Sequence, residues 1–217
     1  MDRTNKMNWS QYNTGQVKLT QGLGKYIKQY GENTRFQRYL EVGTWNGRGS
    51  TMCFAAGFEN RKDSPVLKSL ETNEIMFLEA SNVWKPYPNI HILHSRILSN
   101  IPAVNTIHTS INEEWHSGDI TAFNTASYFD VQAFLPEVVC LDGGEYITYF
   151  EYLEVKDICK VFLLDDTAVA KCKRIVEELR KDPSWKCVAG NDQERNGWAV
   201  FERLEPIDVL SCKDKMP

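Results

Sequence analysis

Short apolar runs that end in an acid or a glycine recur along the chain, and they restrict the possible folds more than any other feature. Four of these runs are RYLEVG (38–43), PVLKSLE (65–71), EVVCLDGG (137–144) and KVFLLDD (160–166). NIHILHS (89–95) is a further strand-like run, and segments with helical spacing of apolar residues, such as STMCFAAGF, lie between the runs. Apolar strands that alternate with helices predict a parallel sheet covered by helices on both faces.

The C-terminal part of the chain breaks this alternation. SWKCVAG (184–190) and GWAVFERL (197–204) are both typical of strands, and a short polar segment joins them. Because so short a connection cannot cross over to a parallel neighbour, the pair is predicted to form an antiparallel hairpin at the edge of the sheet. Within it, Trp198, Val200 and Cys187 are expected to face a helix.

Helical patterns complete the outline. Residues 1–36 are predicted to form an N-terminal helical arm ahead of one α/β domain at 37–210, and the long polar segment 98–134 is predicted to hold a crossover helix with an added loop. After Asp166, the apolar residues of TAVAKCKRIVEELRKD share one face. This pattern predicts an amphipathic helix that begins at Ala168 and turns its charged side chains outward.

Composition argues against two classes of partner. Lysine and arginine number 25 and aspartate and glutamate 29, so the formal net charge is −4, whereas a nucleic-acid groove needs a basic surface. No apolar run reaches the roughly 18 residues of a membrane helix, and the polar N-terminus is not typical of a signal peptide, so a cytoplasmic setting is expected.

The six cysteines form no C-x-x-C pair and are expected to be buried, reduced thiols.

The segment LEVGTWNGRGS (40–50) follows the first strand and carries Glu41 ahead of a glycine-rich turn. It lacks the lysine of a phosphate-binding P-loop, and the gap from Gly43 to Gly47 is too long for the dinucleotide pattern G-x-G-x-x-G. What remains is an acid at a strand end, followed by glycines that let the backbone lie close to a ligand. An acid in this place suits a ligand with a positively charged amino group. The alternative is a turn that only packs a helix onto a strand.

Acids also end two later strands, with Asp142 after one and Asp165 and Asp166 after the next. In an open parallel sheet, ligands bind outside the carboxyl ends of the strands, so these three carboxylates are expected to converge there. Carboxylates that close repel one another unless a cation lies between them, and Mg²⁺ prefers such oxygen ligands. A divalent-metal site is therefore predicted. The alternative is that Asp165 or Asp166 caps the helix beginning at Ala168.

In these segments the chain resembles class I S-adenosylmethionine (SAM) methyltransferases, over residues 36–204. LEVGTWNGRGS is similar to the first motif of that family, which surrounds the methionine end of the cofactor, and Glu71 is similar to the acid that binds both ribose hydroxyls. The resemblance implies an α/β, Rossmann-like, doubly wound and mostly parallel seven-stranded sheet with the antiparallel C-terminal hairpin at its edge. It assigns to the cofactor the residues Glu41, Gly43, Thr44, Gly47, Ser50, Glu71, Ser95 and Asp142.

The stretch from LDGGEY (141–146) to LLDDT (163–167) is most similar to the metal-dependent, macrocin-type O-methyltransferases, which methylate sugar hydroxyls. The resemblance implies Mg²⁺ or Mn²⁺ held by Asp142, Asp165 and Asp166, and a sugar or glycan acceptor, such as a deoxyhexose like rhamnose. It also implies that Asp142 and Glu145 are catalytic. That family places its base as a histidine three positions after the first acid or an aspartate two positions after it. Here Glu145 and Gly144 stand there, which leaves Glu145 as either the base or a further metal ligand.

Two other functions stay open from the sequence. A catechol-type methyltransferase would use the same metal for the vicinal hydroxyls of an aromatic ring, and Trp115 and His116 in segment 98–134 would cover either kind of ring. A non-enzymatic nucleotide- or metal-binding module on the same fold would also tolerate the acids. The sequence does not decide whether the chain forms a homo-oligomer.

Overall fold

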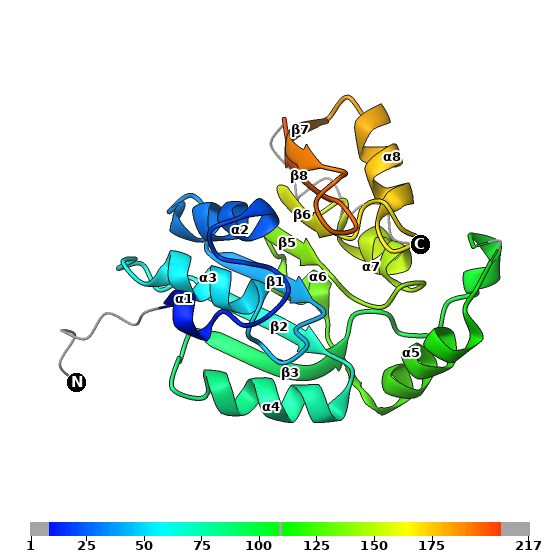
Figure 1. Ribbon diagram of the computed structural model, residues 1–217, viewed down its shortest axis with the longest axis horizontal. Coiled ribbons are helices and arrows are strands. Elements are labelled where there is room, and N and C mark those ends of the chain that lie inside the picture. Colours follow the sequence, from blue (N-terminus) through cyan, green and yellow to red (C-terminus); the bar gives the residue numbers. More distant parts are fainter. Residues whose placement is uncertain (1–8, 109, 205–217) are drawn as a thin grey trace.

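The computed structural model describes residues 9–108 and 110–204, which form an eight-stranded sheet with helices on both faces (Figure 1). The strands are β1 Arg38–Val42, β2 Val66–Glu71, β3 Ile90–Arg96, β4 Ser127–Tyr128, β5 Val138–Leu141, β6 Val161–Asp165, β7 Trp185–Asn191 and β8 Trp198–Arg203. The helices are α1 Trp9–Tyr12, α2 Gly22–Glu32, α3 Ser50–Phe58, α4 Glu74–Trp84, α5 Glu113–Thr125, α6 Val131–Phe134, α7 Thr148–Val155 and α8 Lys173–Lys181, with a 3₁₀ turn at Val104–Thr106.

The strand order is β4-β3-β2-β1-β5-β6-β8-β7. The strands from β4 to β6 pair in parallel, whereas β8 is antiparallel to both β6 and β7. The predicted parallel sheet and its antiparallel hairpin are therefore confirmed. The predicted number of seven strands is corrected to eight, because β4 adds an edge strand of two residues, too short to leave a pattern in the sequence.

Successive residues of the central strands point into two different cores. Tyr39 and Cys140 belong to the core under α2 and α3, whereas Leu40 and Leu141 belong to the core under α7 and α8. Figure 1 shows these two helix pairs on opposite sides of the sheet. Each fully buried side chain of this size contributes about 1.5–3 kcal/mol, which is why the strands are apolar on both faces.

The hairpin completes the first of these cores. Trp198 and Val200 are buried there with residues of α2, and the rings of Tyr26 and Trp198 lie 5.4 Å apart, so both face a helix as predicted. The same prediction for Cys187 is wrong, because β7 is the outer strand of the hairpin and leaves this side chain exposed.

The other thiols behave as expected where the structure describes them. Cys53, Cys140, Cys159 and Cys172 are buried and form no disulfide, and Cys212 lies outside the described residues. In the described ranges, no helix is both long enough and apolar enough to cross a membrane.

Helix α8 is amphipathic as predicted, with Ile175, Val176 and Leu179 buried, but it begins later than predicted. Residues 167–172 form turns, and the helix starts at Lys173. Lys171 therefore lies in a turn next to the end of β6 and does not take the outward position that a helix from Ala168 would give it.

Candidate functional site

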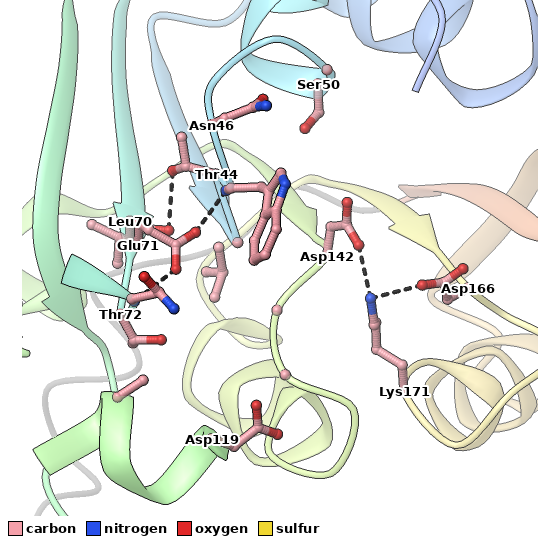
Figure 2. A pocket seen from close by; sticks show the side chains of 18 of the residues that line it. Thr44, Asn46, Ser50, Leu70, Glu71, Thr72, Asp119, Asp142, Asp166 and Lys171 are labelled. Carbon is pink, nitrogen blue, oxygen red and sulfur yellow. Dashed lines mark hydrogen bonds and ion pairs between the residues drawn. The ribbon is translucent and has the colours of Figure 1, made fainter. Parts of the chain in front are cut away.

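A cleft of about 590 Å³ opens at the carboxyl ends of β1, β2 and β5, close to where the strand order reverses (Figure 2). The loop after β1, the residues after β2 and the turn after β5 form its base, and segment 14–17 and part of α5 form its walls. Ligands of open α/β sheets bind in this place, because loops on either side of the reversal separate there.

Some of the predicted site residues line this cleft and others do not. Those that line it are Gly43, Thr44, Ser50, Glu71, Ser95, Asp142 and Asp166. The predicted residues that do not belong to its lining are Glu41, Gly47, Glu145 and Asp165.

Glu41 lies beneath the glycine loop. Its side chain has no exposed surface, because alternation along β1 directs it towards α3. It accepts hydrogen bonds from Thr51 Oγ1 at 2.7 Å and from Ser69 Oγ. Burial raises the pKa of Glu41 to about 7, although these hydroxyl groups lower it. The carboxyl group thus ties β1 to β2 and α3 and supports the loop from below.

Two glycines of the loop are required by packing. Gly43 has φ +90°, and a Cβ there would lie 2.1 Å from the carbonyl oxygen of Asp142, so only glycine lets the loops after β1 and β5 meet. A Cβ at Gly47 would lie 2.6 Å from Trp84 Nε1, which donates a hydrogen bond of 2.9 Å to the Gly47 carbonyl. Gly47 therefore packs the loop onto α4.

Glu71 is held at the cleft by the backbone on either side of it. Its Oε2 accepts the N–H of Trp45 at 2.6 Å, and its Oε1 accepts the N–H of Asn73 at 2.8 Å (Figure 2). Burial raises the pKa of Glu71, while these N–H groups lower it. Because a carboxylate oxygen accepts more than one hydrogen bond, the fixed carboxylate can still bind two neighbouring hydroxyl groups.

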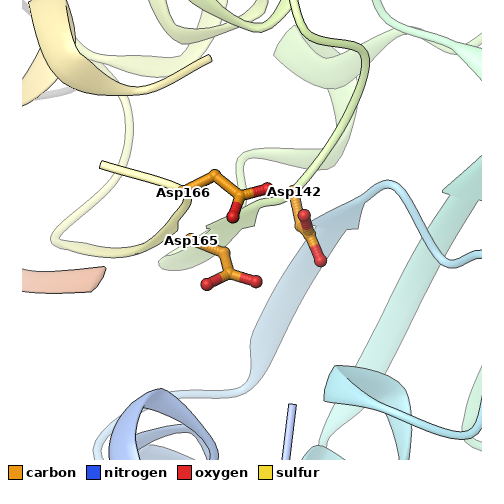
Figure 3. A group of neighbouring side chains, drawn as sticks. All are labelled: Asp142, Asp165 and Asp166. Carbon is orange, nitrogen blue, oxygen red and sulfur yellow. The ribbon is translucent and has the colours of Figure 1, made fainter. Parts of the chain in front are cut away.

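The three aspartates at the ends of β5 and β6 converge, as the sequence predicted. One carboxylate oxygen from each of Asp142, Asp165 and Asp166 lies within 4.8 Å of the others (Figure 3). The helix-cap alternative is wrong, because no helix begins at Ala168 and the residue before α8 is Cys172. Burial and the nearby Asp142 raise the pKa of Asp165 to about 7.

Two cations that the sequence analysis missed lie against these acids. Lys171 Nζ is 2.9 Å from Asp142 Oδ1 and 2.7 Å from Asp166 Oδ2 (Figure 2). Arg195, in the β7–β8 turn, has its Nη1 3.0 Å from Asp165 Oδ2. Burial acts to lower the pKa of Lys171, but the two aspartates raise it above its usual value. The sequence signal for Lys171 is a lysine five residues after Asp166, in a segment whose apolar spacing resembles that of a helix.

No protein-family model matches the sequence, and no curated protein matches it. Solved structures do match. An O-methyltransferase from Bacillus cereus, solved in complex with SAH, has a TM-score of 0.57 and 12% identity over 92% of each chain. A putative O-methyltransferase from Klebsiella pneumoniae has a TM-score of 0.58 and 12% identity, over 92% of this chain and 91% of that one. A putative caffeoyl-CoA O-methyltransferase from Staphylococcus aureus has a TM-score of 0.55 and 16% identity over 86% of each chain.

This chain has a Rossmann-like methyltransferase fold. The likeness covers most of each chain, and at these identities it establishes the fold alone.

On this methyltransferase fold, two further acids reach the cleft that the sequence analysis did not select. Asp119 comes from α5 and Glu151 from α7, and each has a buried oxygen without a hydrogen-bond partner in the described chain. Burial raises the pKa of Glu151 to about 8. A Cβ at Gly143 would lie 2.8 Å from Glu151 Oε2, and one at Gly144 2.6 Å from Asp119 Oδ2. The double glycine after Asp142 therefore makes room for these acids.

The aromatic residues of the cleft also differ from the expectation. Trp115 and His116 do not belong to its lining, and the ring of His116 lies 6.1 Å from that of Tyr146. Trp45 of the glycine loop does line the cleft, and 61% of it is exposed. It has φ +52°, a strained value for a bulky residue. This conformation leaves the indole ring accessible from solvent.

Proposed function

We propose that the protein is a SAM-dependent O-methyltransferase that transfers the methyl group to a hydroxyl of a sugar. The observation that carries the proposal is Glu71, a buried carboxylate fixed by two backbone N–H groups within the same cleft as the glycine loop and Asp142. Solved O-methyltransferases that share the fold, one of them with SAH bound, support it. A fixed acid with free lone pairs suits the two ribose hydroxyls of the cofactor.

The glycine loop would bind the methionine end of SAM. Gly43 and Thr44 line the cleft directly after β1, and Ser50 begins α3 at the same wall. The N-terminus of a helix carries partial positive charge and free N–H groups, which suits the carboxylate of the methionine moiety. In this proposal Glu41 acts through the loop, because its side chain is fully buried below the loop and its Oε2 accepts hydrogen bonds from Thr51 and Ser69.

In the reaction, the oxygen of the acceptor attacks the methyl carbon in line with the sulfur atom. The carbon–sulfur bond breaks, its electron pair stays on sulfur as a neutral thioether, and the hydroxyl proton would pass to the carboxylate of Asp142. Because the sulfonium needs no acid to leave, the protein mainly positions the two reactants. Asp142 would accept a hydrogen bond from the acceptor hydroxyl, since it lines the cleft between the glycine loop and Lys171. Glu145 is half-buried outside the cleft lining, so we give it no role in proton transfer.

A sugar acceptor is supported by the wall of the cleft. Thr14, Gln16 and Asn46 contribute polar groups there, and Trp45 offers an exposed ring on which a sugar face can stack. A catechol ring would stack on Trp45 equally well. A transfer assay must therefore compare sugars with an aromatic diol.

The divalent ion of the sequence prediction is part of this proposal, and the donor set fits it. One oxygen from each of the three carboxylates lies within 4.8 Å of the others, and carboxylate oxygens are the ligands that Mg²⁺ prefers. Asp142, Asp165 and Asp166 would hold the ion, which would supply Lewis-acid polarisation of an acceptor hydroxyl. Lys171, however, already bridges two of these aspartates.

A transfer assay tests the proposal. The full chain would be incubated with SAM and MgCl₂, together with either a set of deoxyhexosides and glycans or catechol, and the products read by mass spectrometry. We expect a methyl gain on a sugar substrate, and a smaller gain with Glu71→Ala when SAM is limiting. A gain on catechol alone would replace the sugar by an aromatic diol. No gain on any acceptor, together with no binding of SAM, would overturn the proposed function.

A further inference from the structure

The acid cluster of Asp142, Asp165 and Asp166 contains a cation that belongs to the chain. The ammonium group of Lys171 lies 2.9 Å from Asp142 Oδ1 and 2.7 Å from Asp166 Oδ2, and only 12% of the lysine side chain is exposed. It reaches the cluster from the turn between β6 and α8, and Figure 2 shows it between the two carboxylates. This ammonium stands between two of the three carboxylates that would hold a divalent ion.

The third carboxylate has a different cation. Arg195 Nη1 lies 3.0 Å from Asp165 Oδ2, while its Nη2 donates a 2.6 Å hydrogen bond to Gln16 Oε1. Arg195 Nη2 is also 3.9 Å from Asp166 Oδ1, a buried oxygen that accepts no hydrogen bond in the described chain. Three carboxylates thus face two fixed cations, so one negative charge remains when all five groups are ionised.

An ammonium group and a divalent ion compete for these carboxylates. An ion about 2.1 Å from an oxygen of Asp142 and one of Asp166 would stand within a few ångströms of Lys171 Nζ. Two like charges at such a distance inside a protein repel strongly, because little water screens them. Lysine has a flexible stem of four carbons, so its ammonium can leave without moving the backbone.

We propose that Lys171 is the resident cation of the acid cluster, and that a divalent ion binds there only by displacing the Lys171 ammonium from Asp142 and Asp166. Lys171 then keeps the three carboxylates from repelling one another in the metal-free protein and weakens the binding of metal. The inference deepens the metal part of the proposed function, but it is tested without cofactor or acceptor. Its failure is therefore distinguishable from failure of the methyltransferase proposal, which depends on SAM.

Titration of Mn²⁺ into the full chain, followed by calorimetry and by the electron paramagnetic resonance of free Mn²⁺, tests the displacement. Lys171→Met keeps the length of the side chain and removes its charge, and it is expected to bind Mn²⁺ at least about tenfold more tightly than the wild type. Lys173→Met is the matched control, because Lys173 is exposed at the start of α8, and it should bind as the wild type does.

Thermal unfolding in EDTA gives a second measurement. Without metal, Lys171→Met should melt at a lower temperature than the wild type, because the three clustered carboxylates no longer have the lysine ammonium near them. Added Mn²⁺ should raise the melting temperature of the variant more than that of the wild type. If Lys171→Met does not fold even with Mn²⁺, Lys171→Gln is measured in the same way. Equal Mn²⁺ affinity in the wild type and the folded variant would overturn the proposal, as would loss of Mn²⁺ binding in the variant.

Discussion

Asp142 and Asp166 share the ammonium group of Lys171, whereas Glu151, which also lines the cleft, has a buried Oε2 without a hydrogen-bond partner in the described chain. Burial without a cation favours the neutral form of an acid, and it raises the pKa of Glu151 to about 8. At neutral pH this side of the cleft therefore carries a protonated carboxyl group.

Glu151 makes stability depend on pH in a defined direction. The pKa of Glu151 is about 8 in the folded protein, whereas its ordinary value is 4.5. The neutral side chain therefore stabilises the fold fully below pH 4.5, and this stabilisation is lost as the pH rises through 8. Glutamine does not ionise, so Glu151→Gln should keep the stability that the wild type loses at alkaline pH. We expect the variant to exceed the wild type in unfolding free energy by on the order of a few kcal/mol at alkaline pH, and by much less at acidic pH.

Urea unfolding at both pH values measures this difference. Glu154→Gln, an exposed position on the same helix α7, is the control and should show no such change with pH. A difference between Glu151→Gln and the wild type that stays the same at both pH values would contradict the account of Glu151.

Among the elements, the connection between α1 and α2 has an unexpected part in the cleft, because its residues 14–17 form one wall. Asn13 fixes this segment to the glycine loop. Its Nδ2 donates to the carbonyl oxygens of Val17 at 3.0 Å and Arg48 at 2.9 Å, and its Oδ1 accepts the N–H of Leu19 at 2.6 Å. Segment 14–17 thus completes the cleft that the strand ends begin.

Asn13→Ala should therefore weaken both the fold and the site. Loss of these buried hydrogen bonds is expected to lower the unfolding free energy by about 2–4 kcal/mol, because their backbone partners stay buried. Asn124→Ala, on the exposed side of α5, is the control and should leave stability nearly unchanged. Urea unfolding and a SAM titration measure both effects. Wild-type stability in Asn13→Ala would show that segment 14–17 does not depend on this side chain.

The loops after β1 and β5 meet at Gly43, where the backbone of one lies against the backbone of the other. A Cβ at Gly43 would meet the carbonyl oxygen of Asp142 at 2.1 Å, and the backbone has φ +90°. Gly43→Ala should lower the unfolding free energy by about 3 kcal/mol or more, because backbone strain and a clash add together. A Cβ at Gly118 meets no atom within 4 Å, so Gly118→Ala should not destabilise the fold. Equal melting temperatures of Gly43→Ala and the wild type would contradict this junction.

For the whole molecule, the sequence predicts the order of strands and helices well, since parallel strands buried on both faces must be apolar runs. The convergence of Asp142, Asp165 and Asp166 follows from the same topology, because neighbouring parallel strands end at one edge of the sheet. The position of Lys171 does not follow, since apolar spacing continues through the turn at 167–172 and resembles an earlier helix start.

The sequence also does not show which strand-end acid lines the cleft. Glu41 is one residue from the end of β1, and that single step places it on the face covered by α3. Glu71 is the last residue of β2, where the chain leaves the sheet and the side chain meets the cleft. Both acids stand at the end of an apolar run in the sequence. Glu71 lines the cleft and Glu41 supports the loop from below, and this difference depends on the residue at which each strand ends.

A calorimetric titration of SAM into the wild type and Glu71→Ala tests whether Glu71 binds the cofactor. We expect the wild type to bind one SAM per chain. Glu71→Ala, shown to be folded by circular dichroism, should bind SAM at least about tenfold more weakly, a loss of roughly 1.5–3 kcal/mol. The Glu154→Gln protein should bind as the wild type does. A folded wild type that gives no heat with SAM, or a Glu71→Ala protein with unchanged affinity, would contradict the account.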